Sequence, residues 1–142
     1  MISKLIKTWL KWSVADRLLV LSASVLVLGF RLGLWFLPFA RLRRFPDFLS
    51  QRLHKSVPLQ SIPLKKLIWS IKITARRIPK ATCLTQALAA QTLLQTYGYE
   101  ARLCVGVMLD EQKKLAAHAW ITHQQAVVIG QLPNLDRFKP LL

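Results

Sequence analysis

Residues 82–130 read TCLTQALAAQTLLQTYGYEARLCVGVMLDEQKKLAAHAWITHQQAVVIG, and their pattern changes at Gly98 from a helical period to an alternating one. Small and apolar residues before this glycine recur with helical spacing, at Cys83, Ala87, Ala90 and Leu94. Thr82 is suited to cap the start of such a helix, and Gly98 is suited to end it in the left-handed conformation. A helix that begins at Cys83 is therefore predicted.

After this glycine, apolar and polar residues alternate, as they do in strands with one buried face. The alternating runs are residues 101–109, 117–122 and 126–130, separated by polar residues at 110–114 and 123–125. Connections this short join neighbouring strands in antiparallel fashion. The sequence predicts an α+β fold, with a helix that carries Cys at its N-terminus packed on an antiparallel sheet.

Two residues of this region have the chemistry of a cysteine hydrolase. Cys83 lies in the first turn of the predicted helix, where unsatisfied N–H groups and the helix dipole favour a thiolate. A thiolate nucleophile needs a base within hydrogen-bond reach, and His118 in the second predicted strand is the candidate. Taken singly, each residue has a structural alternative, as a small buried cysteine or a hydrogen-bonded core histidine. Cys104 lies in mid-strand and is predicted to be structural.

The chain has 142 residues, with 21 Lys and Arg against 6 Asp and Glu, and the excess charge lies in one half. Residues 1–82 hold 16 basic and two acidic residues, a net charge of +14, whereas residues 83–142 have a net charge of +1. We expect the basic half to bind an anionic partner, such as lipid headgroups, an acidic peptide or a protein. No nucleic acid is expected, because neither stacking aromatics among the basic residues nor helix-turn-helix spacing occurs.

Composition excludes several classes of protein. Hydrophobic residues make up 53% of the chain and charged residues 19%, the reverse of a disordered chain. Two cysteines cannot form a disulfide scaffold, and the separation of Cys83 from Cys104 matches no paired zinc site.

The apolar stretch 18–40 has several interpretations. A signal peptide is disfavoured because Arg31 and aromatic residues follow the apolar run where a small-residue cleavage site would stand. The stretch is long enough to span a membrane, but Arg31 lies near its middle and is costly there. Gly29 and Gly33 have the spacing of closely packed helices. A packed helical hairpin or a helix at a membrane surface is therefore favoured over a true span.

A further helix is predicted over residues 63–79, PLKKLIWSIKITARRIP. Its apolar residues follow the helical period, at Leu64, Leu67, Ile68, Ile71 and Ala75, and Pro79 ends it. The change in charge and pattern predicts two parts, a basic, apolar helical region over residues 1–60 and a catalytic domain over residues 61–142.

The ordered motifs resemble those of a known family, the lasso peptide biosynthesis B2 protein, a transglutaminase-like cysteine protease. The resemblance rests on the CLTQAL helix start, the run GYEARL with VGV after it, the HAW strand and the VIG strand, in this order. It covers roughly residues 60–142 and implies a transglutaminase-like or papain-like core with an N-terminal helical extension. It also implies an activity, removal of the leader from a ribosomally made precursor peptide in lasso peptide maturation.

The resemblance assigns roles to named residues. Cys83 is the expected nucleophile, and His118 is the expected general base, which then acts as the acid to the leaving amine. The family carries an Asp near the position of Gln131, so the third member of the triad is either Gln131, by its amide oxygen, or Asp136, the carboxylate downstream of His118. No cofactor or metal is implied.

The implied partners are the precursor peptide, a separate leader-recognition protein and an asparagine synthetase-like lasso cyclase, with a membrane surface as a further candidate. The expected localisation is cytoplasmic, with membrane association through residues 18–40. Two alternatives remain open. The chain could be a catalytically impaired, membrane-associated scaffold that presents the precursor to the cyclase, or a true transglutaminase in which an amine resolves the thioester.

Overall fold

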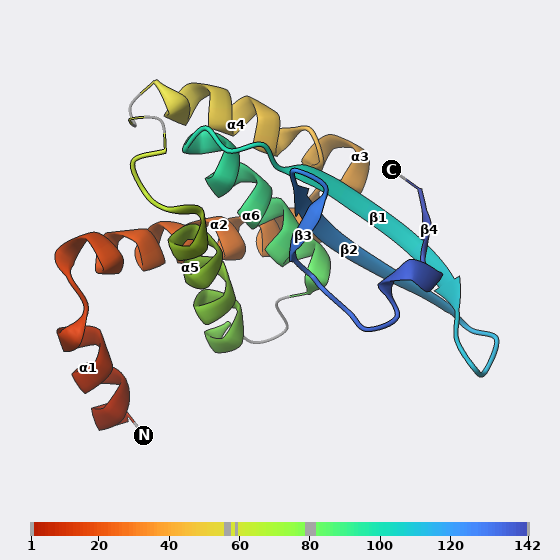
Figure 1. The fold of residues 1–142 in the computed structure, drawn as a ribbon, viewed down its shortest axis with the longest axis horizontal. Helices are drawn as coiled ribbons and strands as arrows, with labels where there is room; N and C mark the ends of the chain where they lie inside the picture. Colours follow the sequence, from red (N-terminus) through yellow and green to blue (C-terminus); the bar gives the residue numbers. More distant parts are fainter. Residues whose placement is uncertain (1, 56–57, 59, 79–81, 142) are drawn as a thin grey trace.

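The computed structural model describes residues 2–55, 58, 60–78 and 82–141, and it has the predicted α+β class (Figure 1). The helices come first: α1 (Ile2–Lys11), α2 (Val14–Phe36), α3 (Phe39–Leu42), α4 (Phe45–His54), α5 (Leu64–Arg77) and α6 (Cys83–Thr96). The sheet follows: β1 (Arg102–Leu109), β2 (Leu115–His123), β3 (Ala126–Ile129), a short 3-10 helix (Leu135–Arg137) and β4 (Lys139–Pro140).

The apolar N-terminal stretch forms one long helix, α2. The Ser13 hydroxyl caps its start by accepting a hydrogen bond from the Asp16 N–H at 3.2 Å. The helix continues through Arg31 and ends at Leu37, which is extended. Leu37 precedes Pro38, and a residue before a proline disfavours the helical conformation. The interpretation of residues 18–40 as a helical hairpin is therefore wrong, since α2 runs without a break to Phe36 and includes both Gly29 and Gly33.

The two remaining predicted helices are confirmed. The amphipathic helix α5 buries Leu67 and Ile71, and its expected stop at Pro79 lies outside the described residues. Helix α6 starts at Cys83 as predicted, and its apolar residues are buried on nearly every side because α2, α4, α5 and the sheet surround it. Gly98, with φ of +83°, turns the chain from α6 toward β1.

The four strands form an antiparallel sheet in the order β3-β2-β1-β4. In the central pair, Gly106 lies opposite His118 and Cys104 lies opposite Trp120. In the turn between β2 and β3, Gln124 and Gln125 both have positive φ, which matches the twist of a tight hairpin. The predicted strands and their order are confirmed, whereas β4 was not predicted.

The two faces of the sheet have different coverings. Ala119 and Ile121 of β2 belong to the buried cluster that includes the apolar residues of α6. Because side chains alternate along a strand, His118 and Trp120 lie on the opposite face, where both rings contact Phe138. The helices therefore cover one face, and the C-terminal segment covers the other.

One hydrophobic core joins the N-terminal helices to the rest of the chain. It contains Leu19, Ala23 and Val27 of α2 together with Leu67 and Ile71 of α5 and the apolar residues of α6. Residues on both sides of the predicted boundary at residue 60 thus share this core. Helix α2 is consequently a structural part of the fold that positions α6 and Cys83.

Candidate active site

Cys83 occupies the position that the sequence predicts, as the first residue of α6. The Thr82 hydroxyl oxygen accepts a hydrogen bond from the Thr85 N–H at 3.2 Å, which fixes the start of the helix. Cys83 is a free thiol, half-buried against the edge of the hydrophobic core. It therefore stands at the helix start that the sequence predicts for the nucleophile.

His118 is held in the middle of β2 by a main-chain group. Its Nε2 atom lies 2.7 Å from the carbonyl oxygen of Gly130. A carbonyl oxygen only accepts, so Nε2 carries the proton of the neutral ring and Nδ1 is the basic nitrogen. The ring lies nearly parallel to that of Trp120, with centroids 6.0 Å apart, and 5.6 Å from the ring of Phe138. These contacts give the imidazole a fixed orientation and a defined tautomer.

Gly130 can place its carbonyl there because it is glycine. Its φ is +87°, and a Cβ atom at this position would lie 2.8 Å from the Ala119 oxygen and 2.9 Å from the Trp120 Cβ. Gly130 was not predicted from the sequence as a partner of His118, because both predicted candidates, Gln131 and Asp136, act through side chains. The available signal was a glycine directly after the apolar run AVVI.

The two candidates for the third member of the triad lie elsewhere. Gln131 is exposed, and its amide Nε2 donates to the Leu132 oxygen at 3.4 Å. Asp136 is exposed in the 3-10 helix. Neither side chain hydrogen-bonds His118 in this structure, so a triad role for either one stays a prediction. The group that the structure places on Nε2 is the main-chain oxygen of Gly130, not one of the two expected side chains.

The structure does not join the nucleophile to the base. Both residues are described, and no hydrogen bond links Cys83 to His118. The strand face that packs in the core with α6 carries Ala119 and Ile121, whereas His118 lies on the other face. The structure therefore shows the two residues of the expected Cys-His pair on their predicted elements but without a contact between them.

One cysteine and two histidines lie outside the candidate site. Cys104 is half-buried on β1 and lies at no helix start. His54 and His123 each approach a main-chain oxygen through Nδ1, that of Thr96 at 3.2 Å and that of Glu100 at 2.7 Å. Within residues 2–55, 58, 60–78 and 82–141, no group of three or more His, Cys, Asp or Glu could hold a metal ion.

Comparison with known proteins gives one match. A family model described as the transglutaminase-like superfamily matches residues 24–142, a range that includes Cys83, His118 and the whole sheet. No curated protein and no solved structure matches the chain. The matched range begins within α2, so residues 24–36 of this helix belong to the part of the chain that matches the family.

Proposed function

The chain belongs to the transglutaminase-like superfamily, and from this premise we propose that it is a cysteine peptidase, the leader peptidase of lasso peptide maturation. The superfamily includes cysteine proteases. The observation that carries the proposal is the orientation of His118, whose Nε2 donates to Gly130 and whose Nδ1 is left as a base. His118 lies on β2, a strand of the antiparallel sheet that follows α6, the helix that begins at Cys83.

The proposed reaction is acyl transfer. His118 Nδ1 takes the proton of the Cys83 thiol, and the sulfur attacks the carbonyl carbon at the junction of leader and core. The C–N bond then breaks, and the imidazolium returns its proton to the leaving amine, which frees the core peptide. Water, deprotonated by His118, attacks the remaining thioester and releases the leader as a carboxylic acid. Substrate binding must first bring Sγ within hydrogen-bond reach of Nδ1.

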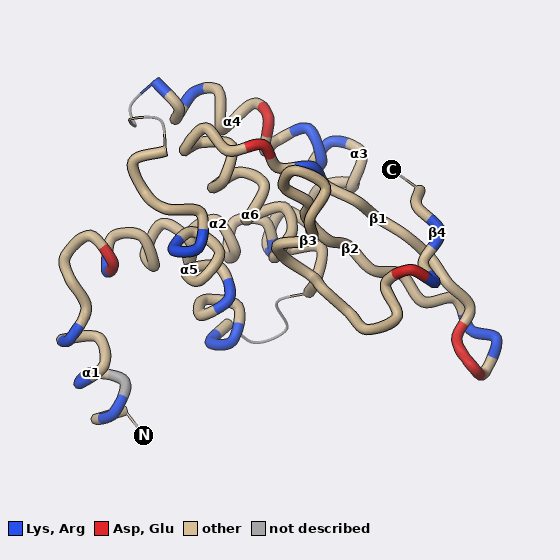
Figure 2. Tube along the Cα trace, in the orientation of Figure 1, with Lys and Arg blue, Asp and Glu red and all other residues tan. Residues whose placement is uncertain are grey.

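The proposal includes partners. The substrate is a ribosomally made precursor peptide, presented by a separate leader-recognition protein, and an asparagine synthetase-like cyclase uses the freed core. The basic N-terminal helices offer positive charge for a negatively charged partner (Figure 2).

A second candidate function is favoured by a specific observation. Cys83 and His118 are not hydrogen-bonded, and among the residues that the structure describes no carboxylate hydrogen-bonds His118. An imidazolium without a carboxylate partner is less stabilised than one in a Cys-His-Asp triad. These facts fit a scaffold that has lost catalysis and presents the precursor to the cyclase.

Mass spectrometry of the precursor peptide separates the two functions. Wild type would be incubated with precursor, with and without the leader-recognition protein, beside Cys83→Ala and His118→Ala. Cys104→Ala and His123→Ala are the matched controls, since each removes the same side chain outside the site. The peptidase proposal expects leader release by wild type and both controls, and none by the two site variants. Release by Cys83→Ala, or none by folded wild type with its partner, would reject it.

An added nucleophile tests which acceptor resolves the thioester. Hydroxylamine should convert part of the released leader to its hydroxamate if a Cys83 thioester forms. A leader joined through an isopeptide bond to another peptide would instead identify a true transglutaminase.

A further inference from the structure

Helix α2 has two apolar faces, and only one of them is covered. The covered face contributes Leu19, Ala23, Val27 and Phe30 to the core shared with α5 and α6. The other face exposes large apolar side chains at spacings of one, three and four residues, at Leu18, Leu21, Val25, Leu28, Leu32, Trp35 and Phe36. Val25, Trp35 and Phe36 are 70%, 73% and 80% exposed. Such a stripe along a whole helix marks an interaction surface.

We propose that this stripe binds the surface of an anionic membrane, with α2 lying in the plane of the interface. By length and composition α2 is the one described helix apolar enough to cross a membrane. A crossing would pull its covered face out of the core, where Ala23 and Val27 are fully buried. An in-plane position keeps that packing and covers the exposed stripe with lipid.

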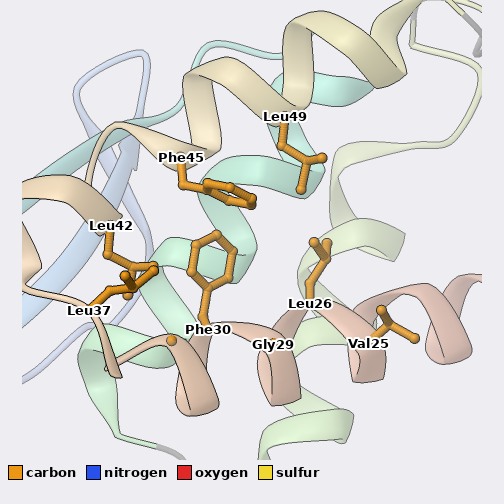
Figure 3. Close-up of a pocket in the computed structure, with 9 residues that line it drawn as sticks. Val25, Leu26, Gly29, Phe30, Leu37, Leu42, Phe45 and Leu49 are labelled. Atoms are coloured by element: carbon orange, nitrogen blue, oxygen red, sulfur yellow. The ribbon is translucent and has the colours of Figure 1, made fainter. Parts of the chain in front are cut away.

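The surface next to the stripe is an apolar groove between α2 and α4. One cavity of about 320 Å³ has walls that include Phe30 and Phe45, whose rings meet edge to face at 6.1 Å (Figure 3). A second cavity of about 540 Å³ continues it along α2 toward Leu18 and Leu53. Val25, Leu26 and Leu49 line both cavities. The apolar surface therefore extends sideways from α2 onto α4.

Basic side chains border this apolar surface. Arg41 of α3 is exposed and directly precedes Leu42, which lines the first cavity. The Arg52 guanidinium of α4 lies 4.9 Å from the ring centroid of Phe48, an exposed side chain whose ring neighbours that of Phe45 in the same cavity wall. The basic residues of α1 are Lys4, Lys7 and Lys11, and this helix stands away from the body of the fold (Figures 1 and 2). On α1, exposed Lys4 and Lys7 accompany exposed apolar residues. Apolar residues beside basic ones are complementary to an interface rich in anionic lipid.

An acidic amphipathic helix of a partner protein is the competing occupant of the groove. The extent of the apolar surface favours lipid. Exposed apolar residues continue past the groove to Trp35 and Phe36, which line neither of its two cavities. A single docked helix would fill the groove and leave these two side chains in water, whereas a bilayer surface would cover them all.

Vesicle flotation with the full chain tests the proposal. Wild type should float with phosphatidylglycerol–phosphatidylcholine vesicles, and much less with pure phosphatidylcholine vesicles or at high salt. The variant Val25→Asp/Leu32→Asp should bind about tenfold more weakly or worse, because two apolar contacts become charges. The matched control is Leu109→Asp/Leu115→Asp, which adds two charges at leucines that are 63% and 71% exposed on the β1–β2 hairpin. The control should bind as wild type does.

The charge contribution is tested in the same assay. Arg41→Glu/Arg52→Glu should lose binding to the anionic vesicles, whereas Lys113→Glu/Lys114→Glu, on the β1–β2 loop, should retain most of it. Circular dichroism of each variant establishes that it is folded. The proposal would be overturned if either stripe or arginine variant bound anionic vesicles as well as its matched control variant. Failure of folded wild type to bind anionic vesicles would also overturn it.

A carbonate wash at high pH separates an in-plane helix from a spanning one. Protein bound at the surface should be released, whereas retention in the vesicles would show that α2 crosses the bilayer and overturn the in-plane geometry.

Tight binding of an acidic helical peptide by wild type that does not bind vesicles would assign the groove to a protein partner. Peptidase activity plays no part in these measurements, so their failure leaves the proposed function untouched.

Discussion

The Nε2 atom of His118 donates a 2.7 Å hydrogen bond to the main-chain oxygen of Gly130. In a Cys-His-Asp triad a carboxylate would occupy this place, and here a peptide carbonyl occupies it. The carbonyl fixes the tautomer and the ring orientation as a carboxylate does, but it brings no formal charge to the imidazolium. The backbone conformation of Gly130 therefore affects both the stability of the fold and the orientation of the His118 ring.

Gly130→Ala should be destabilising by about 1–3 kcal/mol, because a Cβ at positive φ would meet Ala119 and Trp120. It should also lower any Cys83-dependent cleavage rate by displacing the carbonyl from His118. Urea denaturation measures the first effect and the cleavage assay the second.

Gly29→Ala is the matched control. A Cβ there would meet nothing within 4 Å, and the residue is inside α2. Alanine should therefore stabilise this helix by about 0.5–1 kcal/mol. Similar unfolding free energies for the two variants would contradict the role assigned to Gly130.

Gln131→Ala and Asp136→Ala should each change the cleavage rate by no more than about twofold, because neither side chain hydrogen-bonds His118 and both are exposed. Single-turnover cleavage of the precursor is the measurement. A loss of tenfold or more in one variant, on the order seen when a general-base partner is lost, would instead identify that residue as the third member.

Low pH should weaken the link between α2 and α5. Lys66 Nζ lies 2.7 Å from Asp16 Oδ1, and this hydrogen bond lowers the pKa of Asp16 below its ordinary value. The contribution of the pair to stability is complete above the unfolded-state pKa and disappears as the pH falls through the lower folded-state pKa. Thermal melts of wild type and Asp16→Asn should differ at neutral pH and converge in acid. A constant difference across the series would argue against this linkage.

Thr74→Val should leave the unfolding free energy unchanged or raise it by up to about 1 kcal/mol. The Thr74 hydroxyl is buried and has no hydrogen-bond partner among the described residues, so its removal costs no bond. Thr92→Val is the control, because the Thr92 hydroxyl donates to the Leu88 oxygen at 3.0 Å. The control should lose about 0.5–1 kcal/mol. Greater damage from the first variant than from the second would show that the Thr74 hydroxyl has a partner.

Much of the fold could be predicted because it depends on local patterns. The Thr82 cap and Gly98 set the ends of α6, and alternation identified β1 and β2. The strand β4 could not be predicted in this way, since Lys139–Pro140 has neither the length nor the alternation of a strand. It forms because the C-terminal segment returns beside β1, which is a long-range pairing.

For the candidate site, the sequence by itself determined the residue types and their elements, with Cys83 at a helix start and His118 in a strand. The tertiary structure decided what surrounds them. It placed the Gly130 carbonyl on His118, because every residue has a carbonyl and only the path of the backbone says which one arrives. It also decided that α2 buries one of its two apolar faces. Both faces have similar composition, and only packing against α5 and α6 distinguishes them.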